Sequence, residues 1–493
     1  MKKLSHKKLF SFNIHHLIFI IVFSSCSVQK QISKAAQADV LNNKALLAAH
    51  VGISIYEPAT GKYWYNYQGD KYFVPASNTK IPTCYAAMKY LGDSLVGLRY
   101  GIPEEKWFKD NVIVIKPTGD PTFLHFDYTE HPGFNFLKSV SKQKQKIGFC
   151  IDKSQVERWG SGWSWNDYDA AYMAERNVFP VFGNIIRARL NDSAKRVYRD
   201  TSLTPGKLKI GQLVKTQSRY FDSLINTNSP WVSVENARSL SPKFEIERSI
   251  ADNWFIIKNS NNAFSSTSIP FVTNQSSTTL GFLKDTLGKG LRYAVEDGNN
   301  KYLWEGEDAD ITYITINKWN SIYSQPTDSL LKPMMHRSDN FFAEQSLLMV
   351  SNELLGVMND AKIIDTILKT DFKDLPQKPR WVDGSGLSRY NLFTPQSMVA
   401  ILHKMQKEFP VERIKEIFPT GGEGTISSYY KADSGYFYAK TGTLSGVVAL
   451  SGFLYTKKGK LLIFSALVNN HQASATDVRR AVEKFLQGLR NRY

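Results

Sequence analysis

The chain has 493 residues, of which 42% are hydrophobic and 13% aromatic, and its formal net charge is +17. This length exceeds one ordinary domain and the apolar content suffices for packed cores, so we expect two to four folded domains rather than a disordered chain. The positive charge does not by itself exclude a nucleic-acid partner.

The first residues of the chain predict export. Four lysines lie among the first eight residues, and the seven residues from Leu17 to Phe23 form an uninterrupted apolar run. A membrane-spanning helix needs about 20 residues, so the run is typical of a secretory signal peptide, here over residues 1–25. Export argues against nucleic acid and favours an anionic cell envelope as the partner.

A cysteine follows the predicted signal peptide. The stretch Phe23-Ser24-Ser25-Cys26 resembles a bacterial lipobox. We therefore expect a periplasmic protein that is held to a bacterial membrane by lipid on Cys26, with residues 26–43 as a polar tether. Simple secretion without lipid is the alternative.

The mature chain begins with a predicted hairpin and helix. Alternating apolar and β-branched residues predict strands at 51–56 and 62–67, joined by a turn. A helix is expected from about Asn78 to Leu91, with its stop at Gly92.

The second half of the chain predicts a helix, three strands and a final helix. The first helix is expected from Met334 to Leu355, and Thr476 is expected to cap the last helix, which ends near Leu489. The strands between them are expected at 436–443, 446–455 and 461–469. Strand-like runs such as 111–115 and 254–258 interrupt the long middle part of the chain.

Three short motifs lie in one order along these elements. They are Ser77-Asn78-Thr79-Lys80, Ser338-Asp339-Asn340 and Lys440-Thr441-Gly442. Ser-x-x-Lys alone is weak evidence because it recurs elsewhere in the chain, whereas Lys-Thr-Gly occurs once. The ordered set is the signature of penicillin-binding proteins and serine β-lactamases.

The residue types of the first two motifs suit nucleophilic catalysis. A serine hydroxyl needs a base to take its proton, and Ser77 and Lys80 are one helical turn apart, so their side chains should meet. Lys80 acts as a base only when neutral, and burial together with the nearby Lys440 cation should lower its pKa. Ser338 can relay a proton to the leaving amine, and Asn340 can orient Lys80 and hold a substrate amide.

The third motif suits substrate binding. Lys440 and Thr441 fit a terminal carboxylate, and Gly442 has no side chain, so we expect a ligand backbone to lie against this strand. The backbone N–H groups of Ser77 and Thr443 are expected to form an oxyanion hole.

Nearly the whole mature chain resembles the class C low-molecular-mass penicillin-binding proteins, the D-alanyl-D-alanine carboxypeptidase/endopeptidase family. Besides the three motifs, the resemblance rests on Gly119-Asp120-Pro121-Thr122, Gly162-Trp163-Ser164-Trp165-Asn166-Asp167 and Asp383-Gly384-Ser385-Gly386-Leu387-Ser388-Arg389. The long gap between the first and second motifs is also typical of this family.

The resemblance implies an α/β (α+β) fold, with a serine β-lactamase/transpeptidase-like helix–sheet–helix domain and inserted, mainly β domains. The catalytic domain is then expected at 44–98 and 318–493. The insertion is expected at 99–317, made of a second domain at about 99–190 and 281–317 with a third nested at about 191–280.

The resemblance also implies an activity, namely hydrolysis of D-alanyl bonds in peptidoglycan stem peptides through an acyl-serine, with β-lactam antibiotics as inhibitors and no cofactor. Asp167 and Tyr172 are implied to line a pocket for the diaminopimelate side chain, and Asp167 to meet its amino group. Arg389 is suited to the carboxylate of the same side chain.

Several alternatives remain open in the sequence. A serine β-lactamase shares the motifs, and a non-catalytic envelope-binding protein could retain the fold. Asp383 and Ser385 could belong to a Ser-His-Asp hydrolase, but no histidine has a matching context. The nine histidines show no metal-binding spacing, so we expect no metal. Cys84 and Cys150 are either a disulfide or two buried thiols.

Overall fold

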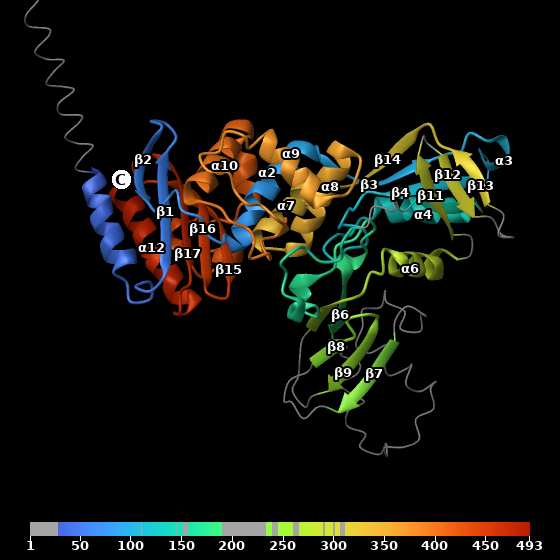
Figure 1. The fold of residues 1–493 in the computed structure, drawn as a ribbon, viewed down its shortest axis with the longest axis horizontal. Coiled ribbons are helices and arrows are strands. Elements are labelled where there is room, and N and C mark those ends of the chain that lie inside the picture. The colour runs from blue at the N-terminus through green and yellow to red at the C-terminus, as the bar shows by residue number, and fades with distance from the viewer. Residues whose placement is uncertain are drawn as a thin grey trace, which may run out of the picture.

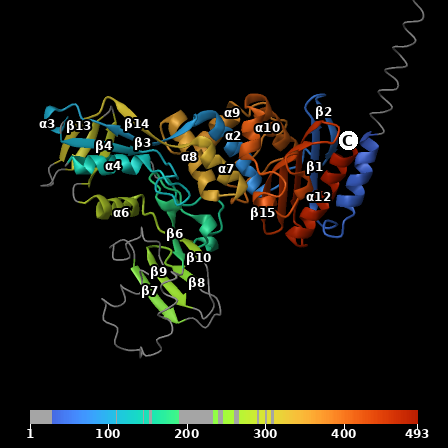
Figure 2. The same cartoon turned by 180° about the vertical axis from the view of Figure 1, so that it is seen from behind.

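The computed structural model describes residues 28–109, 111–143, 145–150, 156–189, 233–238, 245–259, 266–288, 291–298, 301–305 and 311–493. The predicted signal peptide and Cys26 lie outside these residues. Figures 1 and 2 show two bodies side by side, with a smaller three-stranded sheet below the second.

The first body is built on a five-stranded antiparallel sheet in the order β15-β16-β17-β1-β2. Because successive side chains of a strand point to opposite faces, neighbours such as Ile463 and Phe464 serve different cores. The strands are β1 (His50–Glu57), β2 (Lys62–Tyr67), β15 (Phe437–Leu444), β16 (Val447–Tyr455) and β17 (Leu461–Asn469).

Helices cover both faces of this sheet. On one side lies α12, and on the other lie α2 and α10 with α7, α8 and α9 beyond them (Figure 1). The expected helix–sheet–helix fold is therefore confirmed. The helices are α2 (Lys80–Tyr90), α7 (Thr327–His336), α8 (Asn340–Leu355), α9 (Asp360–Lys369), α10 (Pro395–Glu408) and α12 (Ala475–Arg492).

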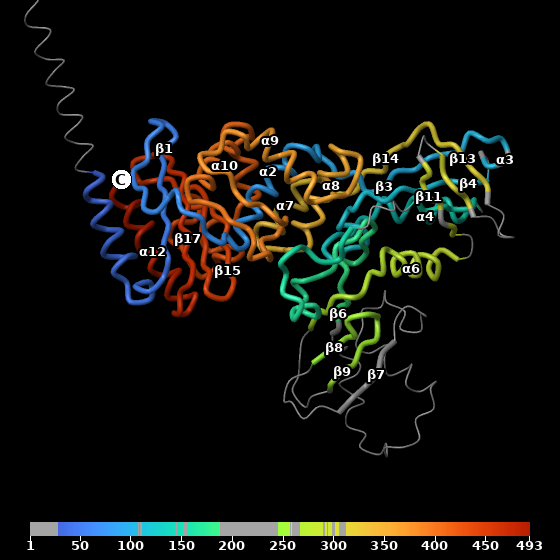
Figure 3. Tube along the Cα trace, viewed as in Figure 1, coloured from blue at the N-terminus to red at the C-terminus, as the bar shows by residue number. Residues whose placement is uncertain are grey.

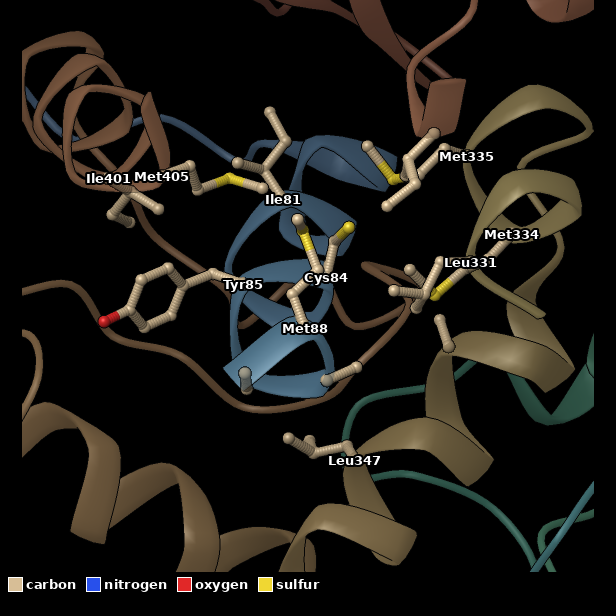
Figure 4. Packing of buried hydrophobic residues seen from close by; sticks show 14 of the residues in the cluster. Ile81, Cys84, Tyr85, Met88, Leu331, Met334, Met335, Leu347, Ile401 and Met405 are labelled. Carbon is tan, nitrogen blue, oxygen red and sulfur yellow. The ribbon is translucent and has the colours of Figure 1, made fainter. Parts of the chain in front are cut away.

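Helix α2 is the centre of the larger core. Figure 4 shows Cys84 and Met88 of α2 facing Leu331 and Met334 of α7. Pro82 lies in the first turn of α2, where a missing N–H breaks no helical hydrogen bond. Cys84 belongs to this core and Cys150 to a separate cluster in the second sheet, so they do not form a disulfide.

The predicted tether differs from the structure. Residues 28–36 are helical and continue into a π-helical turn, η1 (Gln37–Leu41), that packs against α12. Ile32, Ala36 and Val40 recur at helical spacing and are buried under the sheet. The polar composition of the stretch obscured this narrow apolar stripe.

The second body holds a seven-stranded mixed sheet in the order β13-β12-β11-β5-β4-β3-β14. It is flanked by α4 (Pro132–Lys142) and α6 (Ser277–Leu287) (Figure 3). The strands are β3 (Ser94–Gly101), β4 (Val112–Pro117), β5 (Lys146–Cys150), β11 (Leu291–Gly298), β12 (Lys301–Glu305), β13 (Ile311–Thr315) and β14 (Trp319–Pro326).

The chain enters and leaves the second body on neighbouring strands. β3 follows α2, β14 precedes α7, and the two pair antiparallel from Gly101 opposite Trp319. The predicted border at 98/99 falls inside β3 and the border at 317/318 falls just before β14, so the start of β3 and all of β14 lie outside the expected insertion.

The nested third domain predicted at about 191–280 lies largely outside the described residues. Within it, β7 (Ser233–Arg238), β9 (Trp254–Asn259) and β8 (Glu245–Arg248) form a three-stranded sheet, and β10 (Ser266–Pro270) pairs with β6 (Ile185–Arg189), which lies just before the predicted range. The division into nested domains stays a prediction.

Candidate active site

The first motif forms a tight turn at the start of α2. Ser77 lies in a 3-10 turn, η2 (Ala76–Thr79), and Lys80 opens the α-helix, with Lys80 Nζ 3.0 Å from Ser77 Oγ. Ser77 is half-buried and Lys80 is fully buried. The expected meeting of the hydroxyl and the amine is present in the structure.

Two glycines from other motifs hold this turn closely. A Cβ on Gly386 would lie 2.0 Å from the Ala76 carbonyl oxygen, and one on Gly442 would lie 2.6 Å from the Pro75 carbonyl oxygen. Neither backbone atom can move away as a flexible side chain could. The sequence analysis expected Gly442 to make room for a ligand backbone, whereas here the glycine allows the Ser77 turn to pack on β15.

Asn78 fastens the same turn to the sheet. Its Nδ2 donates to the Lys440 carbonyl at 2.8 Å, and its Oδ1 accepts from Ser451 Oγ of β16 at 2.6 Å. The side chain is fully buried, where an unsatisfied amide would be costly. The second residue of the motif is thus a structural link.

The second motif lies at a break between two helices. The sequence predicted one helix from Met334 to Leu355, but α7 ends at His336 and α8 begins at Asn340. Ser338 has a φ of 61°, a left-handed conformation that a continuous helix excludes. Asp339 caps α8 by accepting from the Phe342 N–H.

Because of this break, the side chains of Ser338 and Asn340 contact the two lysines of the other motifs. Ser338 Oγ accepts from Lys440 Nζ at 2.9 Å, and Asn340 Oδ1 accepts from Lys80 Nζ at 2.6 Å. Asn340 Nδ2 donates to the Tyr172 carbonyl at 2.9 Å. All five predicted catalytic residues, which come from three distant parts of the chain, therefore meet in one cluster.

The loop 383–389 supplies a third partner for Lys80. The Ser385 carbonyl accepts from Lys80 Nζ at 2.8 Å, and the Ser385 N–H donates to Glu344 Oε1 at 2.7 Å. The buried Asp383 accepts from backbone N–H groups of the same loop and from Trp163 Nε1. The loop is therefore held from both sides where its carbonyl meets the amine.

Burial is the main reason why the pKa values of Lys80 and Lys440 are lowered. It lowers the pKa of Lys80 to about 8, although Asp383, Asp339 and Glu344 oppose the change. The pKa of Lys440 is lowered well below its usual range, first by burial and then by Lys80 and Arg479. The charge of Lys440, expected from the sequence to help lower the pKa of Lys80, is not among these causes; instead Lys80 lowers the pKa of Lys440.

Asp167 and Tyr172 lie on one short segment, whose Tyr172 carbonyl accepts a hydrogen bond from Asn340. Partial burial and the nearby Asp167 carboxylate raise the pKa of Tyr172. Arg389 is exposed and donates to the Ser445 carbonyl at 2.9 Å. The structure thus places Asp167 near Tyr172 and Arg389 at the β15–β16 turn.

Sequence reasoning missed Glu344, the Ser385 carbonyl and the bond from Trp163 to Asp383. Glu344 lies one helical turn after Asn340, between the apolar stretches 341–343 and 347–350 of a buried helix. A buried glutamate on such a helix is rare unless it has a partner, and this was the available signal. Nothing in the sequence could single out the Ser385 carbonyl, because every residue has a backbone carbonyl.

The described residues form neither a metal site nor a membrane-spanning helix. Within the described ranges, no group of three or more histidine, cysteine, aspartate or glutamate side chains could hold a metal ion. No described helix has the length and apolarity needed to cross a bilayer.

Comparison with known proteins agrees with this geometry. The D-Ala-D-Ala carboxypeptidase 3 (S13) family matches residues 33–218 and 318–489. The chain is 23% identical over 456 residues to D-alanyl-D-alanine carboxypeptidase DacB of Haemophilus influenzae, covering 87% of each chain. It is 24% identical over 461 residues to a D-alanyl-D-alanine carboxypeptidase of Actinomadura sp., covering 88% of this chain and 80% of the other.

A solved structure has the same fold. The crystal structure of penicillin binding protein 4 from Haemophilus influenzae aligns with a TM-score of 0.65 at 21% identity, over 93% of this chain and 98% of that chain. The motifs, the fold and the matched residues agree, and the chain belongs to the D-Ala-D-Ala carboxypeptidase 3 (S13) family.

Proposed function

We propose that this protein is a serine D-alanyl-D-alanine carboxypeptidase/endopeptidase that hydrolyses peptidoglycan stem peptides and is acylated by penicillin. The observation that carries the proposal is the environment of Lys80 Nζ, which lies 3.0 Å from Ser77 Oγ and contacts two carbonyl oxygens. Family membership and the carboxypeptidase relatives support the same activity.

The first half-reaction forms an ester on Ser77. Lys80 takes the hydroxyl proton while Ser77 Oγ attacks the carbonyl carbon of the D-alanyl bond, and the backbone N–H groups of Ser77 and Thr443 stabilise the oxyanion. Ser338, hydrogen-bonded to Lys440 at 2.9 Å, passes a proton to the leaving amine as the C–N bond breaks, and the proton that Lys80 took from Ser77 replaces it, so that Lys80 is again neutral. Water then attacks the ester, gives up a proton to the base and releases the carboxylic acid with free Ser77.

The leaving group decides which of two reactions occurs. Release of a terminal D-alanine is carboxypeptidase action, whereas release of a cross-linked neighbouring stem is endopeptidase action. Lys440 and Thr441 bind the carboxylate on the leaving side, and Gly442 keeps their strand against the Ser77 turn.

The substrate's diaminopimelate side chain binds between Asp167, Tyr172 and Arg389. Asp167 meets the amino group and Arg389 the carboxylate, so a zwitterion is held by one anion and one cation. This assignment is supported by the half-buried Asp167, its influence on the pKa of the nearby Tyr172, and the bond from Asn340 to the Tyr172 carbonyl. The segment that carries Asp167 and Tyr172 thus contacts both the substrate's diaminopimelate side chain and Asn340, which in turn binds the base Lys80.

The protein acts in the periplasm and is anchored to a membrane by lipid on Cys26. The basic and apolar stretch before Cys26 supports export. Val28, two residues later, packs against the core that contains α12, so the lipid would hold the catalytic domain close to the membrane surface.

The activity is tested with purified muropeptides and mass detection of the products. Loss of one D-alanine or cleavage of cross-linked dimers, abolished in Ser77→Ala, is the expected result. Rapid multiple turnover of nitrocefin without peptide cleavage would instead identify a β-lactamase. Binding of peptidoglycan without any cleavage or acylation would identify a non-catalytic protein.

A further inference from the structure

The C-terminal helix reaches the substrate-binding edge of the sheet. α12 is capped by Ser474, which accepts from the Asp477 N–H, and the preceding His471 N–H donates to the Gly446 carbonyl of the β15–β16 turn. This contact places the first turns of α12 beside β15, an edge strand of the sheet. Arg479 lies on the second turn of the helix.

Arg479 contacts a predicted substrate-binding residue. Its Nη2 donates to Thr443 Oγ1 at 2.5 Å, and Thr443 is exposed. Arg479 also lines, together with Thr441 of β15, a small cavity between α12 and the sheet. The cation is therefore placed behind the strand that carries the third motif.

We propose that Arg479 is a positioning residue that turns the Thr443 hydroxyl toward the carboxylate on the leaving side of the substrate. The proposal rests on the function proposed above, which did not assign a role to this arginine. A hydroxyl has one donor hydrogen and two acceptor lone pairs, and a guanidinium can only donate. Arg479 must therefore occupy a lone pair of Thr443 Oγ1, which leaves the hydroxyl hydrogen free to donate to an anion.

The surrounding charge supports an anion at this place. Arg479 is among the causes that lower the pKa of Lys440, after burial and Lys80, so three basic side chains influence one another there. Arg479 Nε is buried without a hydrogen-bond partner among the described residues. A carboxylate that binds at Thr443 and Lys440 would relieve the repulsion between these groups.

The neighbouring arginine offers a matched control. Arg480 donates to Glu483 Oε2 at 2.5 Å and to the Ser428 carbonyl at 3.1 Å, and both contacts lie away from β15. Arg479 and Arg480 share the same helix turn and the same charge. If only the general positive charge of α12 matters, Arg479→Ala and Arg480→Ala should change the cleavage rate alike. A specific role of Arg479 should change the rate in Arg479→Ala alone.

The test compares two peptides that differ only at the C-terminus. An acyl-D-Ala-D-Ala peptide with a free carboxylate and its C-terminal amide are cleaved by the unchanged protein, Arg479→Ala, Arg479→Lys and Arg480→Ala under single-turnover conditions. We expect Arg479→Ala to lower kcat/KM for the carboxylate at least about tenfold, the size expected of a charge-assisted bond. The amide should change less than about twofold, Arg479→Lys should recover part of the loss, and Arg480→Ala should resemble the unchanged protein.

A double mutant tests whether Arg479 acts through Thr443. In a Thr443→Val background, Arg479→Ala should add little further loss, because the hydroxyl it orients is already absent. Equal losses on the two peptides, an unchanged carboxylate rate in Arg479→Ala, or fully additive losses in the double mutant would each overturn the inference. If the unchanged protein cleaves neither peptide and is not acylated by penicillin, the proposed function itself fails.

Discussion

The acylation of Ser77 by penicillin should depend on pH with a midpoint of about 8, the pKa to which burial lowers Lys80. A neutral amine has two N–H donors and one lone pair. Asn340 Oδ1 and the Ser385 carbonyl, at 2.6 and 2.8 Å, are acceptors and take both donors. The lone pair is then left for the Ser77 hydroxyl, as a general base requires.

The sign and size of the effect follow from this count. The neutral form is present above the pKa and is lost as the pH falls, so the rate constant should decrease about tenfold per pH unit below the midpoint. At pH 6 it should be about 100-fold below its plateau. Lys80→Ala should lower the plateau by about 10²–10⁴, the usual contribution of a positioned base.

Glu344→Gln should move the midpoint. Burial raises the pKa of Glu344 to about 7, so its carboxylate is mostly ionised near pH 8 and raises the pKa of Lys80. Glutamine removes the charge and retains an oxygen for the Ser385 N–H. The midpoint should therefore fall, and acylation near pH 8, where Glu344 is ionised in the unchanged protein, should lie closer to its plateau in the variant.

The assay is the rate of covalent labelling by a labelled penicillin between pH 5.5 and about 9.5, a range that brackets the midpoint. Glu353→Gln serves as the control, since Glu353 is on the same helix but pairs with Arg99 of β3 at 2.6 Å. A rate constant that stays flat across this range, or a midpoint that Glu344→Gln does not move, would refute the reasoning about Lys80.

Four further predictions concern other residues. Ser77→Ala should abolish covalent labelling by penicillin, and labelling that persists in the variant would place the nucleophile elsewhere. Asp167→Ala should lower kcat/KM for diaminopimelate-containing peptides about tenfold or more and leave penicillin acylation nearly unchanged; equal losses on both would mark a structural role. Gly442→Ala should destabilise the fold by about 1–3 kcal/mol in thermal unfolding and slow acylation, because its Cβ would lie 2.6 Å from the Pro75 carbonyl oxygen; normal stability and acylation would contradict this packing. Cys26→Ala should release the protein from the membrane fraction with its activity per molecule intact, and retention at low and high salt would contradict a lipid anchor.

Local patterns in the sequence were sufficient for the elements that carry the motifs. The strands predicted at 436–443, 446–455 and 461–469 match β15, β16 and β17 within one residue at each end, because alternation and turn residues determine buried strands locally. The terminal helix was predicted, but its cap is Ser474 rather than Thr476. Both are good capping residues, so tertiary contacts decided between them.

The break at Ser338 could not be predicted from such patterns. Ser338, Asp339 and Asn340 favour a helix N-cap and so hint at a new helix start, but nothing local indicates a serine in the left-handed conformation. The energy that favours the break comes from contacts far away in the sequence, namely the bond from Lys440 to Ser338 and the bond from Asn340 to the Tyr172 carbonyl. Strain in the backbone is tolerated where such contacts hold it.

The protonation state of Lys80 depends on atoms that no sequence motif names. The Tyr172 carbonyl can only accept a hydrogen bond, so it must face Nδ2 of Asn340, and this orients Oδ1 toward Lys80. The Ser385 carbonyl takes the second donor because Glu344 holds the N–H of the same residue. Two backbone carbonyls, one in the inserted segment and one in the loop 383–389, thus decide that the lone pair of Lys80 meets Ser77. The motifs name the side chains that we propose to react, and the two carbonyls favour transfer of the Ser77 proton to Lys80 in the proposed mechanism.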